Sequence, residues 1–271
     1  MKKSLPWAAA LATVWLSAPA VAADIPARVT KARPLPVSPA YDWSGFYLGV
    51  HAGYTFGEDD DISTTGQAAA NVANVAGGAR PALVRLEREG FIGGGQMGYN
   101  WQLTPNWVVG LEADISYVDI RRDVTVVTTP LAGVGTLNNT FRTRMEYFGT
   151  VRGRVGYAAD RTLLYVTGGL AYGEVDNSVA FFGTAGQLQF TGSNNSTEAG
   201  YTVGAGIEHA FASNWTVKAE YLFYDLGDRT VNVAVIPGSG GGGTGYNSRF
   251  ENEGHIVRLG LNYKFGGPGI R

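Results

Sequence analysis

The chain contains 271 residues, with 21 basic and 23 acidic residues, a formal net charge of −2 and no cysteine. The absence of cysteine excludes disulfides, thiolate metal sites and cysteine nucleophiles. The few, interspersed charges exclude a nucleic-acid partner, because binding to phosphate backbones requires clustered Lys and Arg. Glycine accounts for 39 residues and aromatic residues for 12% of the chain, while charged residues account for only 16%, a composition unlike that of an ordinary globular enzyme.

The first 22 residues have the pattern of a secretory signal peptide. Lys2 and Lys3 precede an apolar run at residues 5–16, and small residues follow up to Ala23. The apolar run is shorter than the ~20 residues that a membrane-spanning helix needs. We therefore predict that residues 1–22 are a signal peptide that is removed on export.

Residues 23–43 form a segment rich in proline, which disfavours helix and sheet pairing. Arg28, Lys31 and Arg33 make this segment basic. We predict an extended, flexible periplasmic linker that serves as a spacer for export and assembly. The sequence leaves open whether its basic residues also touch peptidoglycan or anionic lipid head groups.

From residue 44 onward, apolar and polar residues alternate with a period of two, which is typical of strands. The alternation divides into eight segments of the ~9 to 11 residues that a strand needs to cross a membrane. This pattern predicts an all-β fold, an eight-stranded antiparallel up-and-down transmembrane β-barrel over residues 44–265, with a short C-terminal tail at residues 266–271. The predicted strands cover residues 46–56, 90–103, 107–117, 145–157, 162–172, 200–211, 215–223 and 257–265.

The connections between the predicted strands alternate between short turns and long polar loops. In outer-membrane barrels the short turns are periplasmic and the long loops are extracellular, so this asymmetry predicts the orientation of the chain. Part of the second long loop, Val124–Thr128, alternates enough to extend a strand beyond the membrane. The long loops cover residues 58–89, 119–144, 173–199 and 227–252.

Aromatic residues distinguish a membrane barrel from a soluble one in this sequence. They fall near the strand ends on the apolar face, and amphipathic rings favour the membrane–water interface. We therefore predict two aromatic girdles on the outer surface, formed by residues such as Tyr54, Trp101, Trp107, Tyr157, Phe211, Trp215, Tyr263 and Phe265.

Opposite the apolar face, the strands carry charges of both signs, interleaved with glycine. Such residues cannot face lipid, and the interior of an eight-stranded barrel is only wide enough for side chains. Because desolvated charges need partners, we predict a paired polar network in the lumen that blocks continuous water passage. Its predicted members are Glu112, Asp114, Glu146, Arg152, Arg154, Glu208, Lys218, Glu220, Arg258 and Lys264.

Three segments together carry a resemblance to a known family: Asp42–Gly49 in the first strand, Val151–Tyr157 in the fourth and Ala219–Tyr221 in the seventh. They resemble the small outer-membrane β-barrel family of alpha-proteobacteria, which includes surface antigens and haem-binding, porin-like members. The resemblance spans the chain after the signal peptide and implies a bacterial outer-membrane location, in contact with lipid and lipopolysaccharide. The last strand also resembles the recognition signal of the barrel-assembly machinery, carried here by Arg258, Gly260, Tyr263 and Phe265.

Motifs for other chemistry are weak. Gly93–Gly98 matches the glycine fingerprint of dinucleotide sites, but that fingerprint must open a helix, and here the chain continues as a strand. The three histidines, His51, His209 and His255, lie on separate strands without ligand-like spacing, and we interpret them as incidental. We therefore predict no catalytic residues, no metal ligands and no cofactor.

Two features of the long loops leave ligand binding open. The resemblance to haem-binding relatives implies haem only as a loop ligand, held by an exposed Tyr246 or by His255. Asp59–Asp61 could bind a divalent cation that bridges lipopolysaccharide, although a solvated acidic loop tip is the favoured interpretation.

Our leading hypothesis is a structural and surface-interaction protein that is not an enzyme. It would support membrane integrity and present its loops to a host or surface ligand. The alternative is a small porin or a haem-binding uptake protein. A membrane-embedded enzyme ranks third; for a hydrolase, no Ser, His and acid converge in the pattern. The sequence leaves open the loop ligand, ion conduction and the oligomeric state.

Overall fold

The computed structural model describes residues 41–57, 60–86 and 88–266. The predicted signal peptide, most of the predicted linker and all but the first residue of the predicted tail lie outside this part of the chain. No helix within the described ranges is long and apolar enough to span a membrane.

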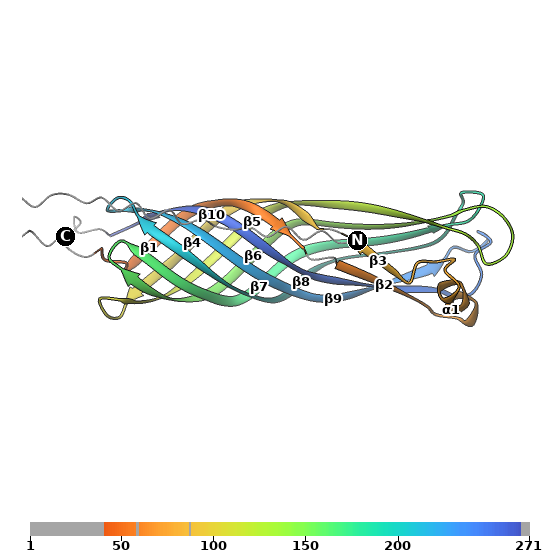
Figure 1. Ribbon diagram of the computed structural model, residues 1–271, viewed down its shortest axis with the longest axis horizontal. Coiled ribbons are helices and arrows are strands. Elements are labelled where there is room, and N and C mark those ends of the chain that lie inside the picture. Colours follow the sequence, from red (N-terminus) through yellow and green to blue (C-terminus); the bar gives the residue numbers. More distant parts are fainter. Residues whose placement is uncertain (1–40, 58–59, 87, 267–271) are drawn as a thin grey trace, which may run out of the picture. The chain divides into compact units, whose positions relative to one another are not determined.

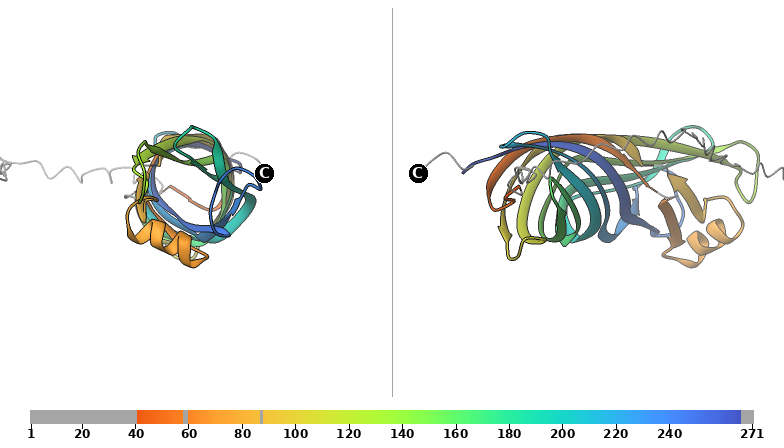
Figure 2. Two further views of the ribbon diagram at one scale, coloured as in Figure 1. Left: turned by 90° about the vertical axis from the view of Figure 1, so that its right-hand side faces the viewer. Right: turned by 60° about the vertical axis from the view of Figure 1, so that its left-hand side comes forward.

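Eight antiparallel strands form a closed ring (Figures 1 and 2). Strands that follow one another in the ring are hydrogen-bonded, and the ring closes where its first strand pairs with its last. The predicted all-β, eight-stranded antiparallel up-and-down barrel is therefore confirmed. The ring consists of β1 (Gly45–Phe56), β4 (Glu89–Gln102), β5 (Trp107–Thr128), β6 (Leu137–Ala159), β7 (Thr162–Phe182), β8 (Leu188–Ala210), β9 (Trp215–Val235) and β10 (Gly245–Lys264).

The first long connection, predicted as a polar loop, instead contains a strand hairpin and a helix. β2 (Asp60–Gly66) pairs with β10, β3 (Leu83–Leu86) pairs with β2, and α1 (Ala69–Ala76) lies between them in the chain. β1 and β4 are shorter than the other ring strands, so β2 covers an edge of β10 that would otherwise stay unpaired. Figure 1 shows the hairpin and α1 at the long-loop end of the barrel.

The remaining ring strands continue far into the segments at 119–144, 173–199 and 227–252, which the sequence predicts as loops. β5 runs through Thr128 and β6 begins at Leu137, so a short tip joins them. The alternation of Val124–Thr128 indicates part of this extension. The polar composition of these segments conceals the rest, because most of their polar residues face outward while most of their apolar residues face into the barrel.

The barrel therefore has two sections with opposite polarity. In the section at the short-turn end, exposed residues are apolar, as at Leu111 and Ile115, and inward residues are charged, as at Glu112. In the section at the long-loop end, called the extension below, inward residues are mostly apolar, as at Phe141, and outward residues are mostly polar, as at Arg142. Lipid around the first section and water around the extension account for this inversion.

The apolar belt of the first section has the height of a membrane. On β5 it extends from Trp107 to Tyr117, both of which are exposed on the outer face. A rise of about 3.4 Å per residue and a strand tilt of about 40° give this step a height of about 26 Å, close to the ~25 Å apolar band of outer-membrane barrels. We call this section the membrane section.

Three apolar clusters and a charged network fill the described interior of the barrel. At the short-turn end, Tyr41 and Trp43 are buried in the barrel mouth, and the Trp43 backbone N–H donates to Gln102 Oε1 at 2.8 Å. The prediction of a flexible linker up to residue 43 is therefore wrong at its end, which packs as part of the core. The other two clusters include Ile92, Val118, Ile120, Phe148 and Leu222 at the border between the sections, and Phe141, Phe181, Val233, Tyr246 and Phe250 in the extension.

Candidate functional site in the barrel lumen

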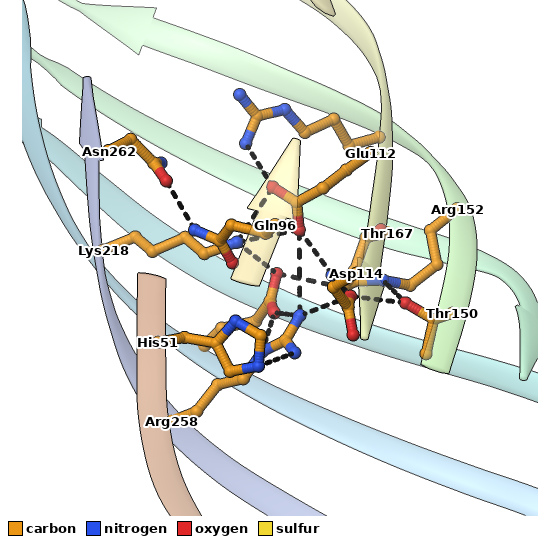
Figure 3. Close-up of polar contacts among 12 residues, drawn as sticks. His51, Gln96, Glu112, Asp114, Thr150, Arg152, Thr167, Lys218, Arg258 and Asn262 are labelled. Atoms are coloured by element: carbon orange, nitrogen blue, oxygen red, sulfur yellow. Dashed lines mark hydrogen bonds and ion pairs between the residues drawn. The ribbon is translucent and has the colours of Figure 1, made fainter. Parts of the chain in front are cut away.

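Buried charges of both signs meet in the lumen of the membrane section (Figure 3). These charged residues occupy inward-facing positions of β5, β6, β8, β9 and β10. Their side chains reach the lumen because successive side chains of a strand point to opposite faces. Four carboxylates face four basic groups, so the network is neutral: Glu112, Asp114, Glu208 and Glu220 against Arg152, Arg154, Lys218 and Arg258.

Arg152 and Arg258 occupy the centre of this network. Arg152 Nη2 donates to Glu112 Oε1 at 2.5 Å and to Asp114 Oδ2 at 3.1 Å. Its Nη1 lies 3.1 Å from Glu220 Oε1. Arg258 donates from Nε to Glu220 Oε2 at 2.7 Å and from Nη2 to Asp114 Oδ2 at 3.0 Å. Each guanidinium thus bridges carboxylates of β5 and β9 across the lumen.

Lys218 and Arg154 extend the network. Lys218 Nζ donates to both oxygens of Glu112, at 2.8 and 2.9 Å. Arg154 Nη1 donates to Glu208 Oε2 at 3.0 Å and lies 3.7 Å from Glu112 Oε2. Glu112 is therefore held by several bases at once, and its side chain has little freedom to move.

Two tyrosines that the sequence analysis did not single out complete the network. Tyr47 O–H donates to Glu112 Oε2 at 2.7 Å, and Tyr165 O–H donates to Glu220 Oε1 at 2.9 Å. The Arg154 guanidinium lies over both rings, 4.9 Å from the Tyr47 centroid and 5.3 Å from the Tyr165 centroid. In the sequence, the one sign that they belong to the network is weak: both tyrosines occupy the polar face of their strands.

Inward-facing glycines make room for these tyrosines. A Cβ atom at Gly98 would lie 2.3 Å from Tyr47 Oη, and one at Gly206 would lie 2.4 Å from Tyr165 Oη. Larger residues at either position would displace the ring. The Gly93–Gly98 run lies on β4, so its glycines serve close packing within a strand and do not open a helix.

Neutral polar side chains also join the network. Thr150 O–H donates to Asp114 Oδ2 at 2.6 Å. His51 Nε2 lies 2.7 Å from Ser116 Oγ and 3.4 Å from Arg258 Nη1. His51, interpreted as incidental to metal or haem binding, is therefore a buried part of the lumen network. The arrangement fixes strands to one another through mutually neutralised charges.

Nine of the ten predicted network residues are buried. Lys264 lies apart from the central group, at the short-turn rim. Its Nζ donates to the backbone oxygen of Asp42 and lies 4.4 Å from the Tyr41 ring centroid. Lys264 thus holds the chain segment that precedes β1 against the barrel mouth.

The prediction is wrong for Glu146, which is exposed. A register shift between Met145 and Phe148 places a bulge in β6 at this point. A bulge reverses which positions of a strand face inward. Even-numbered residues of β6 such as Arg152 therefore face the lumen after the bulge, whereas Glu146, at the bulge itself, faces outward.

All eight predicted girdle residues are exposed. Near the short turns, the rings of Trp215 and Tyr263 lie 5.1 Å apart, and those of Trp107 and Tyr157 lie 5.8 Å apart, both edge to face. Tyr54 lies toward the extension. Exposed aromatic residues at the same border include Phe91, Tyr117 and Tyr201.

The positions of Tyr246 and His255 contradict the hypothesis of a haem ligand in a loop. Tyr246 is buried inside the extension, with its ring centroid 5.2 Å from that of Phe181. His255 belongs to β10 and stacks on Phe56 on the outer face, at 5.6 Å. In the described part of the chain, no group of three His, Asp or Glu residues could hold a metal ion. The side chains of Asp59–Asp61 lie outside the described part.

Comparison with known proteins identifies the family. The chain is 36% identical over 255 residues to the 31 kDa outer-membrane immunogenic protein of Brucella melitensis, covering 91% of this chain and 93% of the relative. It is 30% identical over 236 residues to the 22 kDa outer membrane protein of Rhizobium leguminosarum bv. viciae, covering 86% and 83%. The crystal structure of OprG from Pseudomonas aeruginosa is similar over 84% of this chain and 99% of that chain, with 12% identity and a TM-score of 0.46. Residues 8–265 match the family described as outer membrane protein beta-barrel domain. The chain therefore belongs to this family of β-barrel proteins of the bacterial outer membrane, where lipid and lipopolysaccharide surround it.

Proposed function

We propose that the chain is a non-catalytic structural protein whose closed barrel supports the integrity of the outer membrane and whose extension makes contacts at the cell surface. The filled lumen is the observation that carries this proposal. Apolar clusters at both ends and at the section border enclose the neutral charged network. Such a static filling favours a rigid scaffold over a channel.

A transport role would require a continuous polar path along the barrel. On the periplasmic side of the network, Trp43 is 1% exposed, and on the extracellular side Phe148 and Leu222 are 1% and 0% exposed. An ion would have to cross these apolar layers, where an unpaired charge is strongly disfavoured. This arrangement argues against the small-porin alternative.

The extension supports a role at the cell surface. From Met145 to Leu137, β6 rises beyond the border by roughly 20 Å, taking the rise and tilt of barrel strands. The outer face of the extension carries polar residues such as Thr125 on β5 and Arg142 on β6. The tips therefore stand clear of the lipid, in reach of a host or surface ligand.

We also propose that Tyr263 and Phe265 are the part of the last strand that the barrel-assembly machinery recognises. Their rings are exposed on the outer face, with centroids 5.0 Å apart. Arg258 and Gly260 have a packing role in the lumen instead. Arg258 is part of the ion network, and a Cβ atom at Gly260 would lie 2.9 Å from Lys218 Cγ.

The proposal is tested by deleting the gene and complementing the strain with two versions of the chain. One version is the natural chain, and the other has its tips at residues 129–136 and 236–244 shortened to tight turns. We expect the deletion to raise entry of a hydrophobic dye and sensitivity to detergent. Both versions should restore the barrier, because both keep the membrane section.

Surface contact is measured on the same strains, as binding of intact cells to extracellular glycans and host cells. The natural chain should restore binding and the shortened chain should not. Unchanged dye entry after deletion would contradict the structural role. Equal binding by both complemented strains would contradict the surface role of the tips.

A further inference from the structure

The extension ends in a cavity of about 390 Å³ that opens between the tips of the barrel. All four long connections contribute to its walls, and the residues used below are Asn74, Arg80, Thr184 and Gln189. A cavity of this size lies within the range of ~300–1,000 Å³ that is typical of small-molecule sites. The position is distant from the ion network, which lies in the membrane section.

Arg80 is 3% exposed and has only neutral partners in the described part of the chain. Its Nη1 donates to Asn139 Oδ1 at 2.7 Å and to the Phe182 backbone oxygen at 3.1 Å. Its Nη2 donates to Gln189 Oε1 at 3.0 Å. The guanidinium also lies over the Phe181 ring, 5.1 Å from the centroid.

This environment differs from that of the three arginines in the ion network. Arg152, Arg154 and Arg258 each have a carboxylate oxygen at 3.0 Å or closer. Arg80 has none among the described residues, and burial lowers its pKa. Leaving a buried cation without a counter-charge is strongly destabilising, as is breaking a buried ion pair. The neutral acceptors hold the guanidinium in place but do not neutralise it.

We propose that this cavity binds the carboxylate of an acidic sugar, with Arg80 as its charge partner. A planar guanidinium suits a carboxylate because the two groups can form paired hydrogen bonds. A single cation matches a single negative charge. The Asn74 and Gln189 amides and the Thr184 hydroxyl supply donors and acceptors for sugar hydroxyl groups.

The inference rests on the proposed surface role of the extension. Acidic sugars occur both in the lipopolysaccharide of the cell and in glycans outside it, and the cavity chemistry is the same for both. A purely structural Arg80, which clamps the segment after α1 onto the barrel, is the competing explanation. In that case the cavity would bind no acid.

The test uses the refolded chain in lipopolysaccharide-free detergent micelles and ligand-observed NMR titration. Glucuronate is the probe, glucose is its neutral counterpart, and inorganic phosphate is a compact anion. We expect glucuronate to bind, with glucose and phosphate at least tenfold weaker. Equal binding of glucose or phosphate would overturn the assignment to a sugar carboxylate, and absence of glucuronate binding would overturn the site.

Two variants locate the binding. Arg80→Gln keeps a polar side chain and should weaken glucuronate binding at least tenfold, whereas Arg142→Gln, on the outer face, should leave it unchanged. Thr184→Val alters only the cavity wall and should weaken binding severalfold, so the site remains testable if Arg80→Gln misfolds. Unchanged binding in a folded Arg80→Gln variant, or in Thr184→Val, would contradict the proposed site.

Repeating the titration in micelles that contain lipopolysaccharide separates the two sources of the ligand. Loss of glucuronate binding there would assign the cavity to the sugar of the cell's own lipopolysaccharide. Retained binding would assign it to an external glycan. Arg80→Gln should still restore dye exclusion in the deletion strain, so failure of the cavity and failure of the structural role give different results.

Discussion

Replacing Arg152 by methionine should destabilise the barrel, because it removes one charge from the neutral network and keeps much of the side-chain volume. Glu112, Asp114 and Glu220 each lose a partner that lies 2.5–3.1 Å away. Four buried carboxylates then face three bases. Water cannot compensate, since these side chains are buried.

The size of the effect follows from the partners that remain. Removing one member of a buried ion pair costs about 3–5 kcal/mol. Asp114 and Glu220 keep Arg258, and Glu112 keeps Lys218. We therefore expect the lower end, about 3 kcal/mol, which is roughly two powers of ten in the unfolding equilibrium.

Urea titration of the chain in lipid vesicles, followed by tryptophan fluorescence, measures this loss. The matched control is Arg142→Met on the same strand, whose partner Asp123 and own side chain are 53% and 46% exposed. It should cost less than about 1 kcal/mol. Adding Glu220→Gln to Arg152→Met restores neutrality and should recover at least half of the loss. Equal losses of the free energy of unfolding in Arg142→Met and Arg152→Met would refute the reasoning. So would a double variant whose loss equals the sum of the losses of its two single variants.

Further predictions concern other parts of the barrel. Trp43→Ala should lower the free energy of unfolding by about 3–5 kcal/mol in the same titration, because it leaves a cavity in the periplasmic mouth of the barrel. Trp43→Phe should retain most of the stability of the natural chain. Burial raises the pKa of Tyr41 from 10.0 to about 12, so the folded barrel favours the neutral phenol. The stability this contributes is complete below the unfolded pKa and is lost as the pH rises toward about 12. The difference between the urea midpoints at about pH 9 and about pH 11.5 should therefore be smaller for Tyr41→Phe than for the natural chain. Glu146→Gln should change stability by less than about 0.5 kcal/mol, and a loss near that of Arg152→Met would show that Glu146 faces the lumen. Phe181→Ala should make the extension sensitive to protease while the membrane section keeps its heat-modifiable migration on SDS gels, and full protease resistance would contradict a core in the extension.

The membrane section could be predicted from the sequence because lipid imposes one simple rule on it. Every outward position must be apolar and every charge must face inward, so alternation alone places Glu112, Arg152 and Glu220. The pattern does not reveal which residues meet. Tyr47 and Glu112 are 65 positions apart, and their contact depends on the register and tilt of strands that the pattern leaves undetermined.

The extension could not be predicted because its polarity is reversed. Water surrounds it, so its outward residues are Thr, Asn, Ser and Arg, and these give its segments the average composition of loops. Buried residues such as Phe141 and Phe181 alternate with them, but only the Val124–Thr128 stretch was clear enough to indicate a strand. Bulges at the border changed the parity of β6, which accounts for the error at Glu146.

The reversal has a consequence for stability. The membrane section is held by ion pairs inside an apolar belt, and the extension is held by an apolar core inside a polar surface. Detergents that mimic lipid should therefore protect the first more than the second. The β2–β3 hairpin belongs to the extension, where it continues the wall of the barrel beyond the ends of β1 and β4.

The central claim is that the lumen is closed along its length, and planar-bilayer conductance of the refolded chain tests it most directly. Heat-modifiable migration on SDS gels first establishes that the barrel has formed. The filled lumen predicts no steady single-channel current at any applied voltage that the bilayer withstands. Reproducible, graded channels from the folded chain would contradict the account and would favour a porin.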